Sequence, residues 1–193
     1  TEADLGLGHA RLSIIDVAGG AQPMHNGDRS LCITFNGEIF NYVELREELI
    51  AKGHRFTTQS DTEVILHLYE EEGENCVRRM KGQWAFAIWN ANTRRLFLSR
   101  DRLGVRPLFY SLTGKSFIFG SEAKCILAHP AMKRELNFEA LDQIFTFWCR
   151  VSPATMFKGI LELPPGCSLI VEDGSVTVQQ YWQLGYVTES SPE

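Results

Sequence analysis

Several features that identify whole classes of protein are missing from this chain of 193 residues. It has no basic excess: 24 acidic against 19 basic residues give a net charge of -5, and no positive field is available to collect phosphates. It also has no apolar run near the roughly 20 residues of a membrane span, and its opening Thr-Glu-Ala-Asp is not that of a signal peptide. We therefore expect neither nucleic acid nor a membrane as a partner.

Metal and cofactor motifs are missing too. The five cysteines are odd in number and contain no Cys-x-x-Cys pair, which fits free thiols in a reducing compartment better than a disulfide or zinc framework. The five histidines lack the spacing of metal ligands, and neither a P-loop nor a dinucleotide-binding glycine motif occurs. We expect a cytoplasmic protein with no metal and no cofactor in this domain.

Core-forming residues, by contrast, are plentiful. Hydrophobic residues make up 44% of the chain and aromatic residues 11%, which is enough to bury the core of one domain. No repeat or low-complexity tract appears, and only the tail has the composition of a linker. We expect one domain over residues 1–184 and a linker over residues 185–193.

The first half of the chain predicts strands followed by helices. Leu5–Val17 is mostly apolar and β-favouring, and Leu31–Phe35 is a compact run of strand formers, so both predict strands. Tyr42–Lys52 has apolar residues at helical spacing before a glycine, which predicts an amphipathic helix. Ser60–Glu63 has the pattern of a capping box, in which the two end residues bond each other's backbone amides at the start of a second helix.

The second half predicts an antiparallel meander with further elements after it. Its strands are apolar at nearly every position, as expected for a sheet that is buried on both faces. A sheet packed on a second sheet, with helices outside, accommodates these parts. The predicted strands are 85–89, 95–99, 108–110 and 117–119, followed by a helix capped by Asn137 and a hairpin of 168–171 with 176–178.

Three places carry side chains suited to chemistry. Arg11 lies in an otherwise apolar run, where an unpaired guanidinium is costly, so it meets a carboxylate of the protein or of a ligand. Asn36-Gly37-Glu38 reads as a tight turn, but the turn leads into a predicted helix, and an Asn amide beside a Gly N–H offers the two donors of an oxyanion hole. Asp61 either complements a helix dipole or points outward to receive an ammonium group. An amino acid with a side-chain amide would satisfy all three places.

These residues belong to a longer set of motifs that resembles the glutaminase domain of glutamine-hydrolysing asparagine synthetases, a class II glutamine amidotransferase. The match runs from about Leu5 to Leu184. The resemblance implies an α+β fold, the αββα four-layer sandwich of N-terminal-nucleophile hydrolases, with two antiparallel sheets between helices. The motifs are Gly8-His-Ala-Arg-Leu-Ser-Ile-Ile-Asp16, Gln22-Pro-Met24, Phe35-Asn-Gly-Glu-Ile-Phe-Asn-Tyr42, Ser60-Asp-Thr-Glu-Val-Ile-Leu66, Ala85-Phe-Ala-Ile-Trp89, Arg100-Asp-Arg-Leu-Gly-Val-Arg-Pro-Leu108 and Ser121-Glu-Ala-Lys124.

The resemblance also implies how glutamine is bound. Arg11 would bind the α-carboxylate as a charge-assisted pair, beside backbone groups of Leu12 and Ile14. Glu38 and Asp61 would receive the α-ammonium group. These five residues are the predicted substrate-binding set.

Catalysis in this family implies a role for the remaining candidates. The amide of Asn36 and the N–H of Gly37 would stabilise the oxyanion that forms when a thiolate attacks the side-chain amide of glutamine. Ammonia leaves and the thioester is hydrolysed to glutamate. In the family the ammonia reaches a synthetase domain of the same polypeptide, where ATP and Mg²⁺ are expected and aspartate is converted to asparagine.

Two departures from the family pattern shape our expectations. The family nucleophile is an N-terminal cysteine, which this chain does not show ahead of its Gly8-His-x-Arg motif, so we expect a domain without its first strand and helix that is inactive alone. The synthetase domain that should follow residues 185–193 is also not present. An amidotransferase with an acceptor other than aspartate, or a non-catalytic scaffold of this fold, is the alternative; a homodimer is left open.

Overall fold

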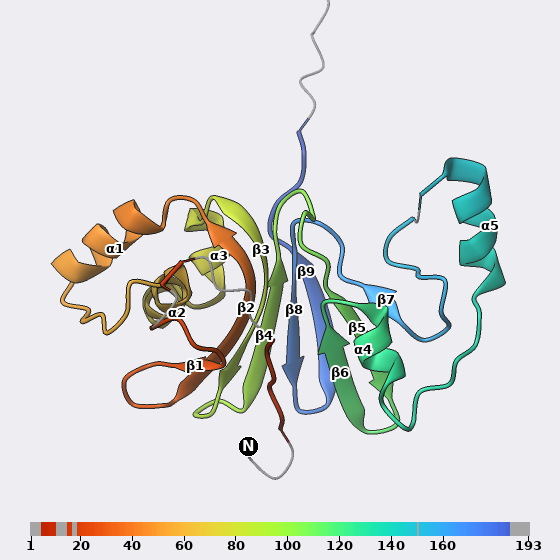
Figure 1. Cartoon of the computed structure of the whole chain (residues 1–193), viewed down its shortest axis with the longest axis horizontal. Coiled ribbons are helices and arrows are strands. Elements are labelled where there is room, and N and C mark those ends of the chain that lie inside the picture. Colours follow the sequence, from red (N-terminus) through yellow and green to blue (C-terminus); the bar gives the residue numbers. More distant parts are fainter. Residues whose placement is uncertain (1–4, 11–14, 17–18, 150, 186–193) are drawn as a thin grey trace, which may run out of the picture.

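Two antiparallel sheets form the centre of the molecule in the computed structural model, which describes residues 5–10, 15–16, 19–149 and 151–185 (Figure 1). The larger sheet has the strand order β1-β2-β3-β4-β8-β9 and the smaller one the order β6-β5-β7. The strands are β1 (Met24–His25), β2 (Leu31–Ile39), β3 (Gly82–Asn90), β4 (Arg95–Arg100), β5 (Phe109–Thr113), β6 (Ser116–Gly120), β7 (Leu161–Glu162), β8 (Cys167–Glu172) and β9 (Ser175–Gln180).

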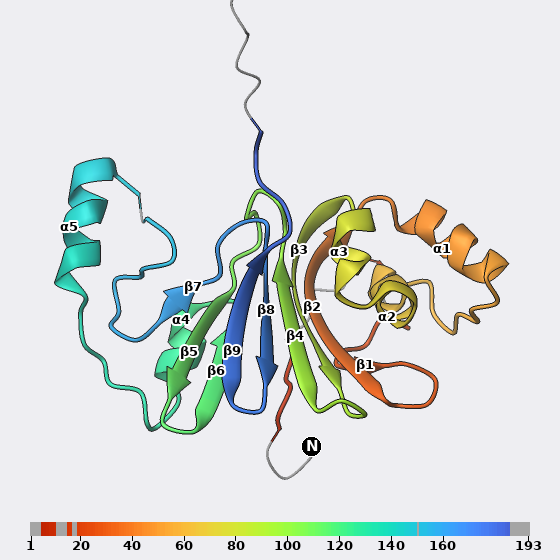
Figure 2. The same cartoon turned by 180° about the vertical axis from the view of Figure 1, so that it is seen from behind.

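Helices cover the outer faces of both sheets, as Figures 1 and 2 show from opposite sides. Three of them and a short 3-10 turn pack on the larger sheet, α4 packs on the smaller one, and α5 stands apart from both. This is the predicted α+β sandwich of four layers. The helices are α1 (Tyr42–Ala51), α2 (Asp61–Glu72), α3 (Cys76–Arg79), α4 (Ala123–Leu127) and α5 (Phe138–Phe147), with the 3-10 turn at Gly73–Asn75.

The continuous apolar pattern of β3 follows from burial on both of its faces. Trp84, Phe86 and Ile88 point into the apolar cluster beneath α1 and α2, while Ala85 and Ala87 point into a second cluster between the sheets. Successive side chains of a strand alternate between its faces, so a strand in the middle of four layers has no polar side. The prediction of a sheet buried on both faces is confirmed.

The predicted meander is divided between the two sheets. β3 and β4 pair within the larger sheet, whereas β5 and β6 pair within the smaller one. The segment between β4 and β5 is held by the buried carboxylate of Asp101, which accepts hydrogen bonds from the amides of Trp84, Leu103, Val105 and Arg106 at 3.0–3.2 Å. The strands predicted as one meander therefore belong to two sheets, because this loop carries the chain across to the second layer.

Other local predictions had mixed outcomes. The described residues of the predicted strand Leu5–Val17 form no strand; Gly6 and Gly8 offer no side chain to pack, which weakens a strand. The helix that begins after Ser60 is confirmed, but the hydroxyl of Ser60 accepts from the amide of Thr62, and the carboxylate of Glu63 does not reach back to Ser60. The helix capped by Asn137 and the β8–β9 hairpin are confirmed. No helix among the described residues is long and apolar enough to cross a membrane.

Candidate functional site

The candidate site lies on the second half of β2. Asn36, Gly37 and Glu38 are strand residues, in register with Ala85, Trp84 and Gln83 of β3. The prediction of a turn at Asn36-Gly37 was wrong, because cross-strand pairing continues to Ile39 and the chain turns only afterwards, before α1. A strand, rather than a turn, therefore presents these three residues.

Glycine is required at position 37 by the close approach of β3. A Cβ atom at this position would lie 2.1 Å from the carbonyl oxygen of Gln83 and 2.8 Å from the Cα of Trp84. The φ angle of Gly37 is +155°, a backbone conformation that residues with a side chain rarely adopt. The contacts with Gln83 and Trp84 are with backbone atoms of β3, and the φ angle is that of Gly37 itself, so moving side chains relieves neither constraint.

The open edge of β2 carries a row of backbone donors. The amide of Phe35 donates to the side-chain oxygen of Gln22 at 2.6 Å, and the amide of Ile39 donates to Asp61 Oδ2 at 3.1 Å. Amides two residues apart in a strand point to the same edge, so the N–H of Gly37 is directed to this edge between the other two. The N–H of Gly37, the predicted oxyanion-hole donor, therefore points to the open edge of β2.

Asp61 is the first residue of α2 and is only 4% exposed. Burial raises the pKa of its carboxyl, and the nearby charge of Glu38 raises it further, against the hydrogen bonds from backbone amides that lower it. Its side chain ties the end of β2 to the start of α2 through the amide of Ile39. The carboxylate is thus buried rather than exposed at the molecular surface, and Asp61 also lines the cavity described next; its role toward an ammonium group stays a prediction.

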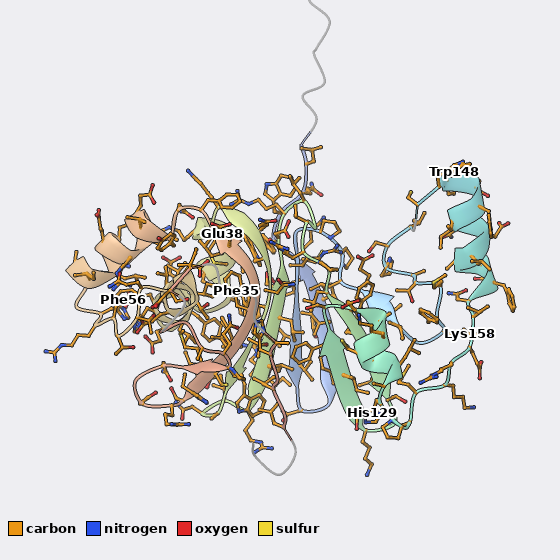
Figure 3. The ribbon with its side chains drawn as sticks, viewed as in Figure 1. Phe35, Glu38, Phe56, His129, Trp148 and Lys158 are labelled. Carbon is orange, nitrogen blue, oxygen red and sulfur yellow. The ribbon has the colours of Figure 1, made fainter. Side chains whose placement is uncertain are left out.

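A cavity of about 620 Å³ between the two sheets brings the described candidates together. Asn36, Gly37, Glu38 and Asp61 all line it, and Figure 3 shows Phe35 and Glu38 along this strand. Two acidic side chains beside the amide donors of β2 suit a ligand that carries both an ammonium group and an amide oxygen. The opposite wall includes Arg106, Phe117, Phe119, Glu122 and Cys125.

The remaining predicted residues lie outside the described part of the chain. Arg11, Leu12 and Ile14 therefore stay predictions. Their neighbours Ala10 and Ile15 both line the same cavity, so the chain on either side of this segment runs along its wall.

Two residues that shape the cavity were not among the sequence-based candidates. The side-chain amide of Gln22 forms hydrogen bonds with both the N–H and the carbonyl group of Phe35. It thus takes the place of a neighbouring strand where the pairing of β1 with β2 has ended. Its Nε2 also lies 3.4 Å from Thr62 Oγ1. Arg106 brings a positive charge to the cavity, and its buried Nε has no hydrogen-bond partner among the described residues. A charged side chain just ahead of a predicted apolar strand was the available signal for Arg106.

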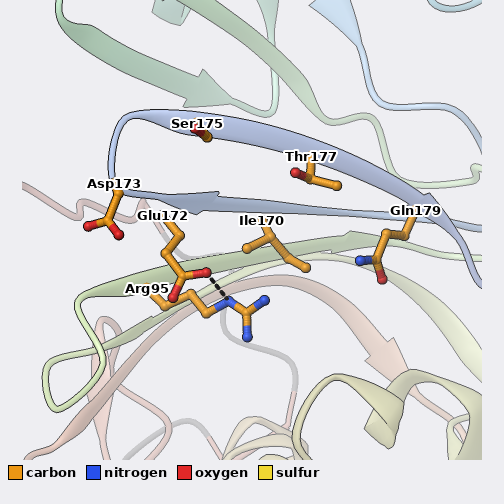
Figure 4. A pocket seen from close by; sticks show the side chains of 7 residues that line it. All are labelled: Arg95, Ile170, Glu172, Asp173, Ser175, Thr177 and Gln179. Carbon is orange, nitrogen blue, oxygen red and sulfur yellow. Dashed lines mark ion pairs between the residues drawn. The ribbon is translucent and has the colours of Figure 1, made fainter.

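A second depression, of about 290 Å³, lies on the face of β8 and β9 (Figure 4). Its one guanidinium, that of Arg95, already pairs with Glu74 at 2.9 Å and with Glu172 at 3.5 Å. Because this guanidinium is already paired with two carboxylates, the depression offers less to an anionic ligand than an unpaired arginine would.

The chain is similar to known proteins over most of its length. Residues 1–182 match the family model described as a glutamine amidotransferase domain. The chain is 45% identical over 182 residues to asparagine synthetase [glutamine-hydrolyzing] 3 of Bacillus subtilis, covering 92% of this chain and 30% of that protein. It is 39% identical to asparagine synthetase [glutamine-hydrolyzing] 1 of the same organism, covering 94% and 29%. The chain thus spans about 30% of the length of these relatives.

The fold is also found among solved structures. The glutamine phosphoribosylpyrophosphate amidotransferase of Bacillus subtilis superposes with a TM-score of 0.62 at 23% identity, covering 84% of this chain and 32% of that one. At this identity the likeness shows the fold alone, and it bears out the predicted αββα sandwich. Given a family match over residues 1–182 and relatives that are 39–45% identical over the 182–183 aligned residues, this chain belongs to the glutamine amidotransferase domain family.

Proposed function

We propose that this chain is the glutaminase domain of an asparagine synthetase, which releases ammonia from glutamine for the amidation of aspartate. The observation that carries the proposal is the meeting of Asn36, Gly37, Glu38 and Asp61 in one cavity. A scaffold without catalytic function has no need for this combination, since burying Asp61 costs free energy that a neutral side chain would not. The names of the two relatives support glutamine as the nitrogen source.

In the proposed complex, glutamine lies along the open edge of β2. Its α-ammonium group faces Glu38 and Asp61, and its side-chain amide oxygen faces the amide of Asn36 and the N–H of Gly37. Arg11 binds the α-carboxylate, beside Leu12 and Ile14. Donors held in place by a strand need little reorganisation when charge develops on the oxygen, and one such donor contributes about 10²–10³ in turnover.

The reaction requires a thiolate, which attacks the amide carbon of glutamine. Ammonia departs, and water then hydrolyses the thioester to glutamate. The nucleophile we propose is the N-terminal cysteine of the family pattern, so the 193-residue chain should bind glutamine without turning it over. Cys125 is the one cysteine among the described wall residues. Replacing it with serine in a polypeptide that carries the N-terminal cysteine checks this reading, because glutamine turnover should then be unchanged.

The ammonia acceptor belongs to a part of the polypeptide beyond this domain, which is where we place ATP and Mg²⁺. Helix α5 supports a docked neighbour, because it stands apart from both sheets and exposes several large apolar side chains (Figures 1 and 3). Trp148 at its end is 93% exposed. Exposed apolar patches of this kind mark interaction surfaces, and we assign this one to the synthetase part of the polypeptide. A carboxylate acceptor other than aspartate is the alternative.

Calorimetric titration with L-glutamine tests the binding step. We expect heat from the unaltered chain at millimolar glutamine, and loss of that heat in Glu38→Gln, which removes a charge from the cavity wall. Glu172→Gln is the matched control, because Glu172 lines the other depression. L-asparagine, shorter by one methylene, should bind more weakly, since its amide cannot reach the donors of β2. Heat equal to buffer dilution for the unaltered chain would refute glutamine binding by this cavity.

A further inference from the structure

A second cluster of side chains suited to ligand binding lies on the outer helical layer. His54 follows α1, while His67 and Glu70 lie on α2, the first of them about 9 Å along the helix from Asp61. We propose that His54, His67 and Glu70 bind one divalent transition-metal ion of the zinc class. This site is separate from the proposed glutamine site and does not depend on it.

The three ligand atoms are already close enough to share an ion. His54 Nδ1 lies 3.1 Å from His67 Nδ1 and 3.5 Å from Glu70 Oε2, and His67 Nδ1 lies 2.7 Å from Glu70 Oε2. Around a tetrahedral zinc ion, nitrogen and oxygen ligands at about 2.0–2.2 Å from the metal are about 3.4 Å from one another. Two of the three separations have to open, the 3.1 Å one by about 0.3 Å and the 2.7 Å one by about 0.7 Å.

The same three atoms do not satisfy one another without a cation. His67 Nδ1 faces two partners, a ring nitrogen and a carboxylate oxygen, at hydrogen-bonding distance. A single imidazole nitrogen carries either one proton or one lone pair, so it cannot bond both partners well. A metal ion accepts a lone pair from each ring and charge from the carboxylate, and it removes this conflict.

Two of the ligands also have a polar partner on the side that faces away from the site. His54 Nε2 lies 2.9 Å from Glu71 Oε1, and Asn26 Nδ2 donates to Glu70 Oε1 at 2.8 Å, which leaves Glu70 Oε2 toward the site. A histidine that binds metal through one ring nitrogen usually donates the other N–H to a carboxylate or carbonyl oxygen. The Glu71 contact provides this arrangement for His54.

The third ligand, His67, has a carboxylate near its other ring nitrogen, although the two do not form a hydrogen bond. His67 is buried, and its Nε2 has no hydrogen-bond partner among the described residues while Glu63 Oε1 lies 3.9 Å away. Four hydrogen bonds of 2.6–2.8 Å from Thr57 and Thr58 fix the carboxylate of Glu63. A fixed carboxylate on this side favours a proton on Nε2 of His67 and leaves the lone pair of Nδ1 for the metal.

The donor set and its exposure indicate the kind of ion. Two imidazoles with one carboxylate suit Zn²⁺, Co²⁺ or Ni²⁺, whereas Ca²⁺ and Mg²⁺ prefer oxygen ligands throughout. The side chain of Glu70 is 28% exposed, so solvent reaches the site and can supply a fourth ligand. Phe56, labelled in Figure 3, packs its ring edge-on against His67, with the ring centroids 4.6 Å apart, and limits rotation of that ligand.

Metal titration of the chelator-stripped 193-residue chain tests this site. We expect Zn²⁺ in 100-fold excess over its dissociation constant to raise the melting temperature by about 5–10 °C. Co²⁺ should give the visible absorption of tetrahedral coordination without a sulfur charge-transfer band, because no ligand is a cysteine. His54→Gln and Glu70→Gln should each weaken Zn²⁺ binding at least tenfold, whereas His25→Gln, at an exposed histidine of β1, should leave it unchanged.

The outcomes separate this proposal from its rivals. Equal Zn²⁺ affinity in His54→Gln and the unaltered chain would overturn it, and so would a Co²⁺ spectrum with thiolate bands or no stabilisation by Zn²⁺. Should one variant lose its circular dichroism spectrum, the other variant and the Co²⁺ spectrum still decide. Glutamine binding by folded His54→Gln should stay unchanged, so failure of the metal site and failure of the proposed function are distinguishable.

Discussion

Replacing Gly37 with alanine tests whether the site depends on the contact between β2 and β3. The added Cβ would lie 2.1 Å from the carbonyl oxygen of Gln83, where a separation below 3.0 Å forces a shift. The obstacle is backbone in a paired strand, so the two strands have to separate locally. The N–H of residue 37 then moves away from the position that the oxyanion requires.

The cost of Gly37→Ala has two parts. Overpacking in a well-packed region costs about 1–3 kcal/mol, and a positive φ angle at a residue with a side chain adds about 1–2 kcal/mol. The sum of about 2–5 kcal/mol is a large part of the 5–15 kcal/mol that stabilises a typical domain. At roughly 2–4 °C per kcal/mol, the melting temperature should fall by about 4–20 °C.

Gly114→Ala is the matched control. Gly114 also has a positive φ angle, +58°, but it lies in the turn between β5 and β6 with nothing within 4 Å of an added Cβ. Its variant should therefore lose only the conformational part, about 1–2 kcal/mol, and keep glutamine binding. Thermal melts and glutamine titrations of both variants make the comparison. Equal melting temperatures for the two variants, or full glutamine binding by Gly37→Ala, would refute the reasoning.

Three further predictions follow from burial and charge. Burial raises the pKa of Asp61, so ionisation of its carboxyl destabilises the fold as the pH rises through that pKa. Asp61→Asn carries no such charge, and its melting temperature should exceed that of the unaltered chain increasingly from about pH 4 to neutral. Its affinity for glutamine should fall. Glu162→Ala leaves the buried Arg100 without its partner at 3.0 Å and should cost about 3–5 kcal/mol in urea unfolding, against about 0–1 kcal/mol for Glu135→Ala at an exposed pair. Trp148→Ser should reduce the binding of a hydrophobic dye by the isolated chain without lowering its melting temperature.

Elements that are specified by their own residues were predictable from the sequence. Helix α5 has its cap at Asn137, whose side chain accepts from the amide of Ala140, and the β8–β9 hairpin turns at Asp173-Gly174 with both residues at positive φ. Each depends on contacts within a few residues. A local pattern is sufficient evidence for an element when the interactions that stabilise it are local too.

The Asn36-Gly37 pair shows where local evidence fails. Asn-Gly is typical of a hairpin turn because both residues tolerate positive φ, yet here it continues a strand. Glycine is present because Gln83, nearly fifty residues later, passes too close for a side chain. The identity of the site residues was predicted from the family resemblance, while their conformation depended on a strand that no local window contains.

The histidines make the same argument for ligand binding. His54 and His67 are 13 residues apart in sequence, which fits no familiar metal motif, and their spacing argued against a metal. The turn after α1 brings His54 back against α2, where the i, i+3 pair of His67 and Glu70 was visible in the sequence all along. Spacing rules describe ligands on one element. A ligand set divided between a helix and the preceding loop has to be found from burial and from polar atoms that lack adequate partners.

The same criterion applies to Arg100 and Asp101. Two charged residues at the end of an apolar strand need several hydrogen-bond partners. That need predicts an ordered crossover between the sheets rather than a simple turn.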